Sequence, residues 1–573
     1  MGSAVFNGGP GVVILFVITG IACAFTAFCY SDFASRIPVA GSAYTYAYAS
    51  FGELFAWIIG WALIMEYSIG NIYVAYSWSD YFTSFLSRIH VNMPAYLTTS
   101  YMEAKHAFEG GSTNTELIDA WKNAPMLGNL RMILDLPALV INLLITYLVY
   151  RGIKESRNFS NLMVILKMGV VLLIILVGGY LVFSNSLTSN WMPADDEGVA
   201  SFMPNGFSGV MAAVASVFFA YIGFDAVSVL AEESHNPQRD LPRGMIYSLV
   251  ICTVVYILLT LVLTGAVNYR KFDGVGDPLA FIFEKENLNM GWMQFLVSIS
   301  AVVAMTSVLL VFQMGQPRIW MSMSRDGLLP PVFQKIHHKF KTPSFSTIVT
   351  GLVVGLPILF TDKTFVLDFT SIATLFAFVL VCGGVLLIPR KEKAPGKFNL
   401  PYINGKLIFP VIIFGTIAVI ATNDETYFPR QVNFDFEAKI KTLNQQLPAV
   451  IKDSTQSATE IKTWLTSQSD TVYTKLATAV NSKASSGEQV QLVKKYIADN
   501  DPLKSKTAKI STAIFWLLMI GLAILSFIKN YSLIPLMGVA TCLYLLTGMT
   551  AMNWAWFGGW LGPWASHLPD VRV

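Results

Sequence analysis

Charged residues are scarce in this sequence, and their scarcity excludes an ordinary soluble protein. Lys, Arg, Asp and Glu make up 13% of the 573 residues, whereas hydrophobic residues make up 54% and the mean hydropathy is +0.54. Soluble domains carry about 25% charged residues. The formal net charge is only +3, and the basic residues form no continuous stripe along the sequence, so we expect no nucleic-acid partner. The composition predicts a polytopic protein whose surroundings are a lipid bilayer.

Cysteine and histidine are also rare, which limits the chemistry available inside the membrane. The five cysteines all lie in apolar segments and are interpreted as small hydrophobic residues rather than disulfide partners or metal ligands (Cys23, Cys29, Cys252, Cys382 and Cys542). None of the six histidines lies inside an apolar segment. The spans hold no paired acid at catalytic spacing and no nucleophile beside a base. We therefore expect neither an enzyme nor a bound metal or cofactor.

Long apolar runs are what the sequence has in abundance. A helix of about 20 residues crosses a hydrocarbon core of about 30 Å, and twelve runs reach or approach that length. They cover residues 11–31, 53–86, 134–150, 159–183, 206–233, 245–267, 290–317, 344–360, 365–388, 406–422, 511–528 and 532–549. The sequence therefore predicts an all-α polytopic fold.

Lys and Arg are distributed unequally between the connecting loops. With residues 423–510 left out, the loops on one side hold 17 of them and those on the other side hold 8. Cytoplasmic loops carry the excess of positive charge, so the first side is predicted to be cytoplasmic. Residue 1 then lies outside, and such a start predicts that a preceding span is missing.

Two polar insertions are predicted on the outer side. Residues 88–133 are expected to form two short amphipathic helices. Residues 423–510 are rich in Lys, Gln, Thr and Ser, and their apolar residues recur at helical spacing, which predicts helices outside the membrane. The longer insertion is either a cap that binds a partner or gates the protein, or a solvated addition without such a role.

Only three ionisable residues lie inside the apolar runs and away from their ends: Glu66, Lys167 and Asp225. At 1.5 Å per residue, Lys167 lies roughly 13 Å from the cytoplasmic end of its run, Asp225 roughly 12 Å and Glu66 roughly 20 Å. Charges at this depth are costly and mark functional sites by default. Lys167 is a candidate proton carrier because burial disfavours its charged form. The alternative is a static ion pair that holds helices together.

The run at 206–233 has Gly223 two residues before Asp225. A glycine here permits a break, and broken helices are tolerated in membranes where they are buried or line a watery cavity. Such breaks hold substrate in transporters, and their free carbonyls suit an ammonium group. The alternative is a kinked helix with a satisfied Asp225. Aromatic residues flank the break and form a candidate lid, although each alone fits ordinary packing (Phe218, Phe219, Tyr221 and Phe224).

Five segments carry recognisable motifs in a fixed order. They are PVAGSAYTYAYASFGE (38–53), WALIMEYSIGN (61–71), NLMVILKMG (161–169), FFAYIGFDAVSVLAEESHNPQRDLPRGM (218–245) and GQPRIWMSMSRDGLLP (315–330). Together they resemble the amino acid–polyamine–organocation transporters, most closely the cationic amino acid transporter branch and its bacterial relatives. The resemblance covers roughly residues 10–400 and returns at 532–561.

The resemblance implies a LeuT-like bundle of two inverted five-helix repeats, in which the broken first and sixth helices form the substrate site. Residues 206–233 correspond to the sixth helix. The carbonyls of Phe219, Ala220 and Ile222 are then expected to receive the substrate ammonium beside Gly223, with the Phe219 ring as a gate.

The resemblance also implies coupling to protons. Lys167 corresponds to a lysine of the fifth helix that stands where sodium sits in sodium-coupled relatives. Glu66 corresponds to the carboxylate of the third helix, and Asp225 is expected to support the site. The eighth helix is expected to offer Thr306 or Ser307 as a partner for Lys167.

The chain departs from the family pattern in two places. The first helix, whose glycine-rich break binds the substrate carboxylate, is absent, which predicts a truncated coding sequence. An extra pair of spans precedes the eleventh helix, and the last helix is cut short after Trp560. The expected divisions are a core at 1–400, an inserted span at 401–422, an extracytoplasmic helical insertion at 423–510, a second inserted span at 511–528 and truncated final helices at 529–573.

These features predict a permease of the cytoplasmic membrane that carries an amino acid with a proton by alternating access. Two alternatives remain open. One is an amino acid or polyamine exchanger without net proton flux. The other is a nutrient sensor that does not transport and that signals through residues 423–510.

Overall fold

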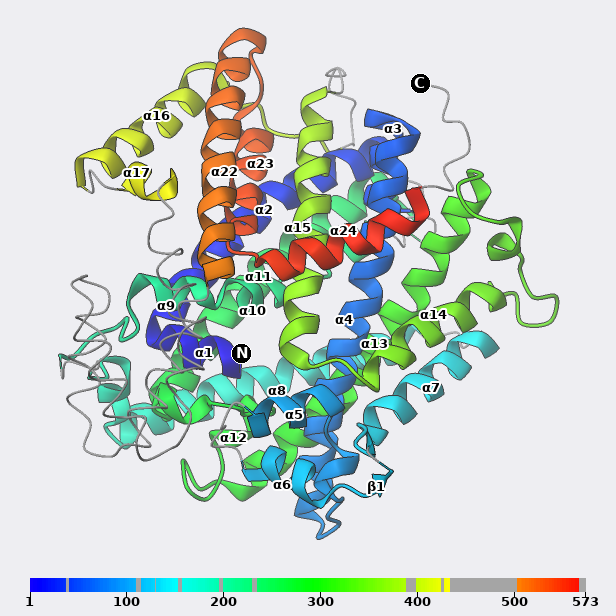
Figure 1. Cartoon of the computed structure of the whole chain (residues 1–573), viewed down its shortest axis with the longest axis vertical. Coiled ribbons are helices and arrows are strands. Elements are labelled where there is room, and N and C mark those ends of the chain that lie inside the picture. The colour runs from blue at the N-terminus through cyan, green and yellow to red at the C-terminus, as the bar shows by residue number, and fades with distance from the viewer. Residues whose placement is uncertain are drawn as a thin grey trace. The chain divides into compact units, whose positions relative to one another are not determined.

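The computed structural model describes residues 1–37, 41–109, 115–128, 130–152, 157–194, 199–228, 234–387, 398–423, 427–432 and 502–565 (Figure 1). The central part of the predicted polar insertion, residues 433–501, lies outside the described residues, so its predicted helices stay a prediction.

Each predicted span is helical over most of its described length, except that the span at 206–233 is interrupted. Its main helices are α1 (Gly2–Gly8), α2 (Val12–Arg36), α3 (Ala43–Phe51), α4 (Glu53–Arg88), α5 (Tyr101–Glu109), α6 (Thr115–Asn123), α7 (Leu136–Arg151), α8 (Arg157–Ser184), α9 (Gly206–Ala212), α10 (Val214–Phe219), α11 (Pro237–Ala266), α12 (Pro278–Phe281), α13 (Gly291–Arg325), α14 (Ser344–Ile358), α15 (Lys363–Leu387), α16 (Gly405–Asn423), α17 (Tyr427–Val432), α22 (Pro502–Lys529), α23 (Leu533–Leu546) and α24 (Ala551–Ala565). Among the described helices, eight are long and apolar enough to cross a membrane. The prediction of an all-α polytopic protein is therefore confirmed.

The two helices predicted in the outer insertion at 88–133 are observed as α5 and α6. They pack on each other and are followed by a small hairpin of β1 (Met126–Leu127) and β2 (Leu130–Arg131). The side of the protein that carries this insertion is called the outer side below.

The larger of two compact units, residues 1–403, 532–545 and 556–573, is organised around α4. This helix contacts α3, α7, α13, α14 and α15 (Figure 1). Within its most apolar stretch 89% of the residues are buried, compared with 11% for α8. Helix α8 is the more apolar of the two and can face lipid, whereas α4 carries polar residues such as Glu66, Asn71 and Ser79 that are buried inside the bundle.

Buried amide and hydroxyl side chains, here called the amide ladder, connect four helices of this unit. Asn71 of α4 donates to Gln313 Oε1 on α13, and Gln313 Nε2 donates to Thr146 Oγ1 on α7 at 2.7 Å. One turn earlier on α7, Asn142 donates to the carbonyl of Gly351 on α14 at 3.1 Å. A Cβ atom at position 351 would lie 2.5 Å from Thr146 Cγ2, so this glycine permits the close approach of α14 to α7.

The second unit, residues 404–531 and 546–555, contains the inserted helix pair. Helices α16 and α22 pack against each other. The amide of Gly405 donates to the carbonyl of Tyr531 at 2.9 Å, and Ser526 Oγ donates to the carbonyl of Gly405 at 3.0 Å. The spans predicted at 406–422 and 511–528 are therefore a pair of adjacent helices.

Candidate functional site

The helix expected to break near Gly223 does so. Helix α10 ends at Phe219, and residues 220–224 form turns before a short helical turn resumes at Asp225. Gly223 has a φ of +118°, a backbone conformation that side chains with a Cβ atom rarely adopt. The glycine is therefore the residue that permits the chain to leave the helix.

Asp225 stabilises the backbone immediately after the break. Its Oδ1 accepts a hydrogen bond from the amide of Gly223 at 3.2 Å. Ser228 Oγ donates to the carbonyl of Asp225 at 2.6 Å and lies 2.7 Å from Ser42 Oγ, just before α3. The second half of the broken segment is thus attached to the connection between α2 and α3.

Glu66 of α4 lies close enough to Asp225 for the two carboxyl groups to interact, and Thr374 of α15 lies beside Glu66. Both acids are only 1% exposed. Two phenols, Tyr30 of α2 and Tyr67 of α4, share the same surroundings. The structure therefore brings together two of the three ionisable residues predicted at depth.

These four side chains have unsatisfied polar atoms. Glu66 Oε2, Asp225 Oδ2, Tyr30 Oη and Tyr67 Oη are buried and make no hydrogen bond to any described residue. We call these four residues the central oxygen cluster. A buried polar atom without a partner costs about 1–3 kcal/mol, and such atoms in native structures need an explanation. A proton bound by one of the acids, or a donor group from a ligand, would supply hydrogen bonds to this cluster.

Aromatic rings surround the break, and their role as a lid stays a prediction. Phe378 of α15 lies 5.8 Å from Phe218, 5.2 Å from Phe224 and 5.5 Å from Tyr30, measured between ring centroids. On the other side, the Phe219 ring lies 4.5 Å from Tyr73 of α4. The rings exclude water from the acids and position Phe219 between the break and α4.

Two of the three carbonyls expected to receive an ammonium group already accept hydrogen bonds. Tyr256 of α11 donates its hydroxyl to the carbonyl of Ala220 at 2.7 Å. The amide of Ile222 donates to the carbonyl of Phe219 at 3.2 Å. Because a carbonyl oxygen has two lone pairs, each can still accept a second donor. Tyr256 was not identified from the sequence and fixes the orientation of the broken segment.

Lys167 lies in a different place from the other two ionisable residues. It lines a cavity of about 280 Å³ between α8, α13, α4 and α12, together with Tyr81, Leu279, Ser300 and Met305. Glu66 and Asp225 are not among the residues that line this cavity. The site of Lys167 is thus mostly apolar and separate from the central oxygen cluster.

The predicted partners of Lys167 on α13 do not line that cavity either. The hydroxyl of Thr306 accepts from Trp78 Nε1 at 2.9 Å and donates to the carbonyl of Val302 at 2.8 Å. Ser300, two turns before Ser307, is the hydroxyl residue that lines the cavity. The pairing of Lys167 with Thr306 or Ser307 stays a prediction.

The sequence reasoning did not single out Tyr30, Tyr67 or Thr374. Tyr67 directly follows Glu66, and all three residues are polar side chains within apolar runs. A buried phenol normally finds a hydrogen-bond partner, so Tyr67, which lies in the same span as Glu66, was the one available signal.

Among the described residues, no group of three or more His, Cys, Asp or Glu side chains is placed to hold a metal ion. The polar groups that the structure places around the break are carboxyl groups, phenols and backbone carbonyls.

Comparison with known proteins gives a consistent result. A family model described as "Amino acid permease" matches residues 2–434. The chain is 38% identical over 455 residues to "Branched-chain amino acid permease BcaP" of Bacillus subtilis (strain 168), which covers 78% of this chain and 89% of that protein. It is 38% identical over 414 residues to "Methylthioribose transporter" of the same organism, covering 72% and 80%. It is 32% identical over 449 residues to "Cationic amino acid transporter 2, vacuolar" of Arabidopsis thaliana, covering 77% and 64%.

Proposed function

The chain belongs to the amino acid permease family, and from that premise we propose that it carries an amino acid together with a proton by alternating access. Its relatives are named as permeases and transporters, so it is a multi-pass membrane transport protein and not an enzyme. Proton symport, rather than exchange, is the specific part of the proposal.

The observation that carries the proposal is the position of the central oxygen cluster beside the break at Gly223. The carbonyls of Phe219, Ala220 and Ile222 supply acceptors for the ammonium group of the substrate, with Phe219 as the gate. Binding there would share the Ala220 carbonyl with Tyr256. The substrate ammonium would then lie near Glu66 and Asp225, and no further anionic side chain is needed to balance its charge.

Proton coupling follows from the cost of burying two carboxylates that interact with each other. Two such groups cannot both be ionised cheaply, so a proton bound to one of them stabilises Glu66 and Asp225 together. Symport requires that the proton and the substrate are bound together, so we propose that the singly protonated cluster is the form that accepts the substrate. Lys167 is proposed as the second group that gains and loses a proton, and it would do so in the cavity between α8 and α13.

Which class of amino acid is carried can be measured by competition between substrates for uptake. One relative is named for branched-chain amino acids, one for cationic amino acids and one for methylthioribose. An α-amino group is what the carbonyls at the break would recognise, so we propose amino acids as substrates and the cell membrane as the location.

Uptake of radiolabelled amino acids into proteoliposomes tests the proposal. An inward proton gradient should drive accumulation by the unaltered protein, and Lys167→Ala should reduce that accumulation at least about tenfold. Lys529→Ala is the matched control, because Lys529 is exposed at the end of α22. Unchanged gradient-driven uptake by Lys167→Ala would remove this lysine from the mechanism.

The same vesicles distinguish symport from exchange. Counterflow by the unaltered protein that ignores the proton gradient, with no net accumulation, would favour an exchanger and contradict proton symport.

A further inference from the structure

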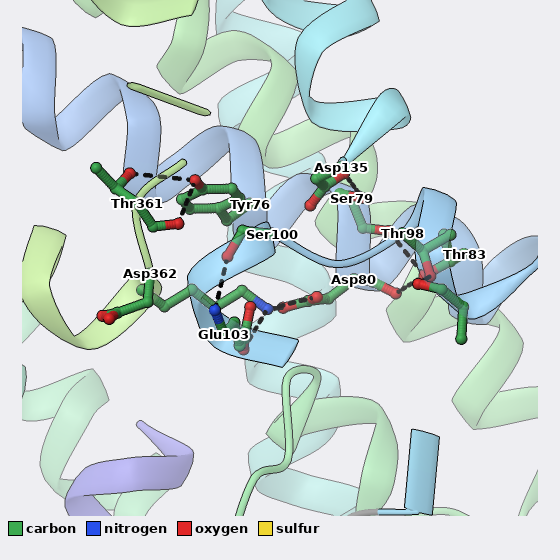
Figure 2. Close-up of polar contacts among 12 residues, drawn as sticks. Tyr76, Ser79, Asp80, Thr83, Thr98, Ser100, Glu103, Asp135, Thr361 and Asp362 are labelled. Atoms are coloured by element: carbon green, nitrogen blue, oxygen red, sulfur yellow. Dashed lines mark hydrogen bonds and ion pairs between the residues drawn. The ribbon is translucent and has the colours of Figure 1, made fainter. Parts of the chain in front are cut away.

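The outer end of α4 makes a set of charged contacts that the transport site does not use. Figure 2 shows Tyr76, Ser79 and Asp80 of this helix directed at three neighbouring segments. Tyr76 donates its hydroxyl to the turn between α14 and α15, 2.9 Å from the Ile358 carbonyl and 2.8 Å from the Thr361 carbonyl. Ser79 donates to Asp135 Oδ1, at the start of α7, at 2.6 Å.

Asp80 forms the charged part of this contact. Lys363, the first residue of α15, places its Nζ 2.7 Å from both carboxylate oxygens of Asp80. The same Nζ lies 3.8 Å from Glu103 Oε1 on α5. The exposed fractions of these side chains are 17%, 25% and 22% for Asp80, Lys363 and Glu103, so water screens the charges only in part.

The electrostatics favour a charged lysine. Burial lowers the pKa of Lys363, but the carboxylates of Asp80 and Glu103 outweigh burial and raise it above its ordinary value. One cation therefore serves two anions that lie on different helices, and removing it would leave two carboxylates facing each other.

The loop that precedes α12 also touches Asp80. A Cβ atom at Gly276, in the loop between α11 and α13, would lie 2.6 Å from Asp80 Oδ2 and 2.8 Å from its Cγ. Position 276 is therefore restricted to glycine as long as Asp80 keeps its place. Any side chain there would displace the carboxylate from Lys363.

Helix α5 contacts the start of α15 at a second point. His106 Nδ1 lies 3.2 Å from Asp362 Oδ2, and this contact is ionic only when the histidine is protonated. Asp362 Oδ1 also accepts from the amide of Phe365 at 2.7 Å, which caps α15. The outer insertion thus rests on the first turn of α15.

We propose that Asp80, Lys363 and Glu103 form an outer latch that joins α15 to α4 and to the outer insertion, and that this latch must release during each transport cycle. The inference deepens the proposed function and rests on it, because it assigns positioning residues to the movement of α15.

The connection to the site runs along two continuous helices. Thr374 and Phe378, which contact the central oxygen cluster and the lid, follow Lys363 on α15 by 11 and 15 residues, or about 16 Å and 22 Å. Glu66 precedes Asp80 on α4 by 14 residues, or about 21 Å. A tilt of α15 away from α4 at the latch would therefore move the rings that cover the break.

Covalent closure of the latch is the decisive experiment. The double variant Asp80→Cys/Lys363→Cys in proteoliposomes is treated with a short bifunctional methanethiosulfonate cross-linker, which replaces the ion pair by a bridge of similar length. Uptake should fall at least about tenfold and return after reduction with dithiothreitol. The two single variants, treated in the same way, are the controls. Uptake by the bridged protein equal to that of its reduced form would overturn the latch.

A second pair of variants avoids the cysteines. Gly276→Ala should displace Asp80 and change the external KM for substrate about threefold or more, whereas Gly291→Ala should leave it unchanged, because no atom lies within 4 Å of a Cβ there. The charge reversals Asp80→Lys and Lys363→Asp alone place like charges together and should also change the external KM, and the charge exchange Asp80→Lys/Lys363→Asp should restore it. Failure of the exchange to restore the KM, with the protein still folded, would count against the latch.

The two proposals fail in different ways. If the unaltered protein takes up no amino acid, the proposed function is wrong. If it does so and the bridged variant transports equally well, only the latch is wrong.

Discussion

Two groups of carboxylates along α4 have opposite surroundings. At the outer end, Asp80 and Glu103 share the ammonium group of Lys363. In the centre, Glu66 and Asp225 form no ion pair with a described residue, and each has a buried oxygen without a hydrogen bond in the described structure. A paired charge holds helices together, whereas an unpaired one costs free energy until a proton or ligand arrives. The difference separates a contact that positions helices from one that is available for chemistry.

The largest effect is expected at the centre. Glu66→Gln keeps the shape of the side chain but removes one of the two carboxyl groups that can bind a proton in the central oxygen cluster. Gradient-driven uptake should fall about 100-fold or more, while Glu53→Gln, at the exposed start of the same helix, should leave it unchanged. Equal uptake by the two variants would mean that Glu66, like the residues of the outer latch, only positions helices and does not take part in proton coupling.

A smaller effect, on stability, is expected at the outer end. Lys363→Met leaves Asp80 and Glu103 partly buried without their cation, which should lower the free energy of unfolding by about 1–3 kcal/mol. The measurement is the Tm in detergent, compared with that of the unaltered protein. If the Tm does not change, the ion pairs of Lys363 contribute nothing to stability, and the outer end of α4 does not differ from the centre in the way described above.

A pH-dependent effect is expected where Asp135 caps α7. Burial raises the pKa of Asp135 to about 7, although hydrogen bonds from Ser79 and the amide of Ala138 oppose this shift. Because the folded protein keeps this proton to a higher pH than the unfolded chain, the stability that Asp135 contributes is fully present below about pH 4 and is lost as the pH rises to about 7. Asp135→Asn has no such proton. The Tm of the unaltered protein minus that of the variant should therefore decrease between pH 4 and pH 7.

Asp277 does not confuse that measurement. Burial also raises the pKa of Asp277 to about 7, but this residue is the same in both proteins and its contribution cancels. A difference in Tm that stays constant or increases with pH would contradict the assignment to Asp135.

The smallest effect is expected at His106. Its side chain is 62% exposed, and exposed pairs contribute about 0.2–1 kcal/mol. His106→Ala should therefore shift the Tm by no more than about 1–2 °C. A larger loss than that of Lys363→Met would mean that the outer insertion is held mainly by the histidine.

The sequence predicted the elements better than the contacts between them. Apolar length predicted twelve spans, and among the described residues eight of them coincide with helices long and apolar enough to cross a membrane. Gly223 beside Asp225 predicted the break, and both signals are local. Depth along a helix placed Glu66, Lys167 and Asp225 in one layer, but depth is only one coordinate. Rotation about the axis decides which neighbour a side chain meets, and spans that are apolar on every side carry no periodic signal for it. Lys167 consequently lines a separate cavity.

The outer latch illustrates the same limit. Asp80 and Lys363 are separated by 283 residues, and each lies at the end of an apolar run where charged residues are common. Their pairing depends on how α4 and α15 pack, and no local pattern encodes that arrangement. Tyr30 is a similar case, since its hydroxyl becomes notable only through its place near Glu66 and Asp225.

The amide ladder has a consequence for biosynthesis. Asn71 and Gln313 are 242 residues apart, so at about 5–20 residues per second the ribosome adds α13 roughly 12–50 s after the corresponding part of α4. During that interval the amides of Asn71 and Asn142 are in the bilayer without their final partners. The nascent chain must therefore be held by the insertion machinery, or find temporary partners, until α13 and α14 arrive. Substitutions in the ladder should accordingly reduce the yield of inserted protein more than the turnover of the molecules that assemble.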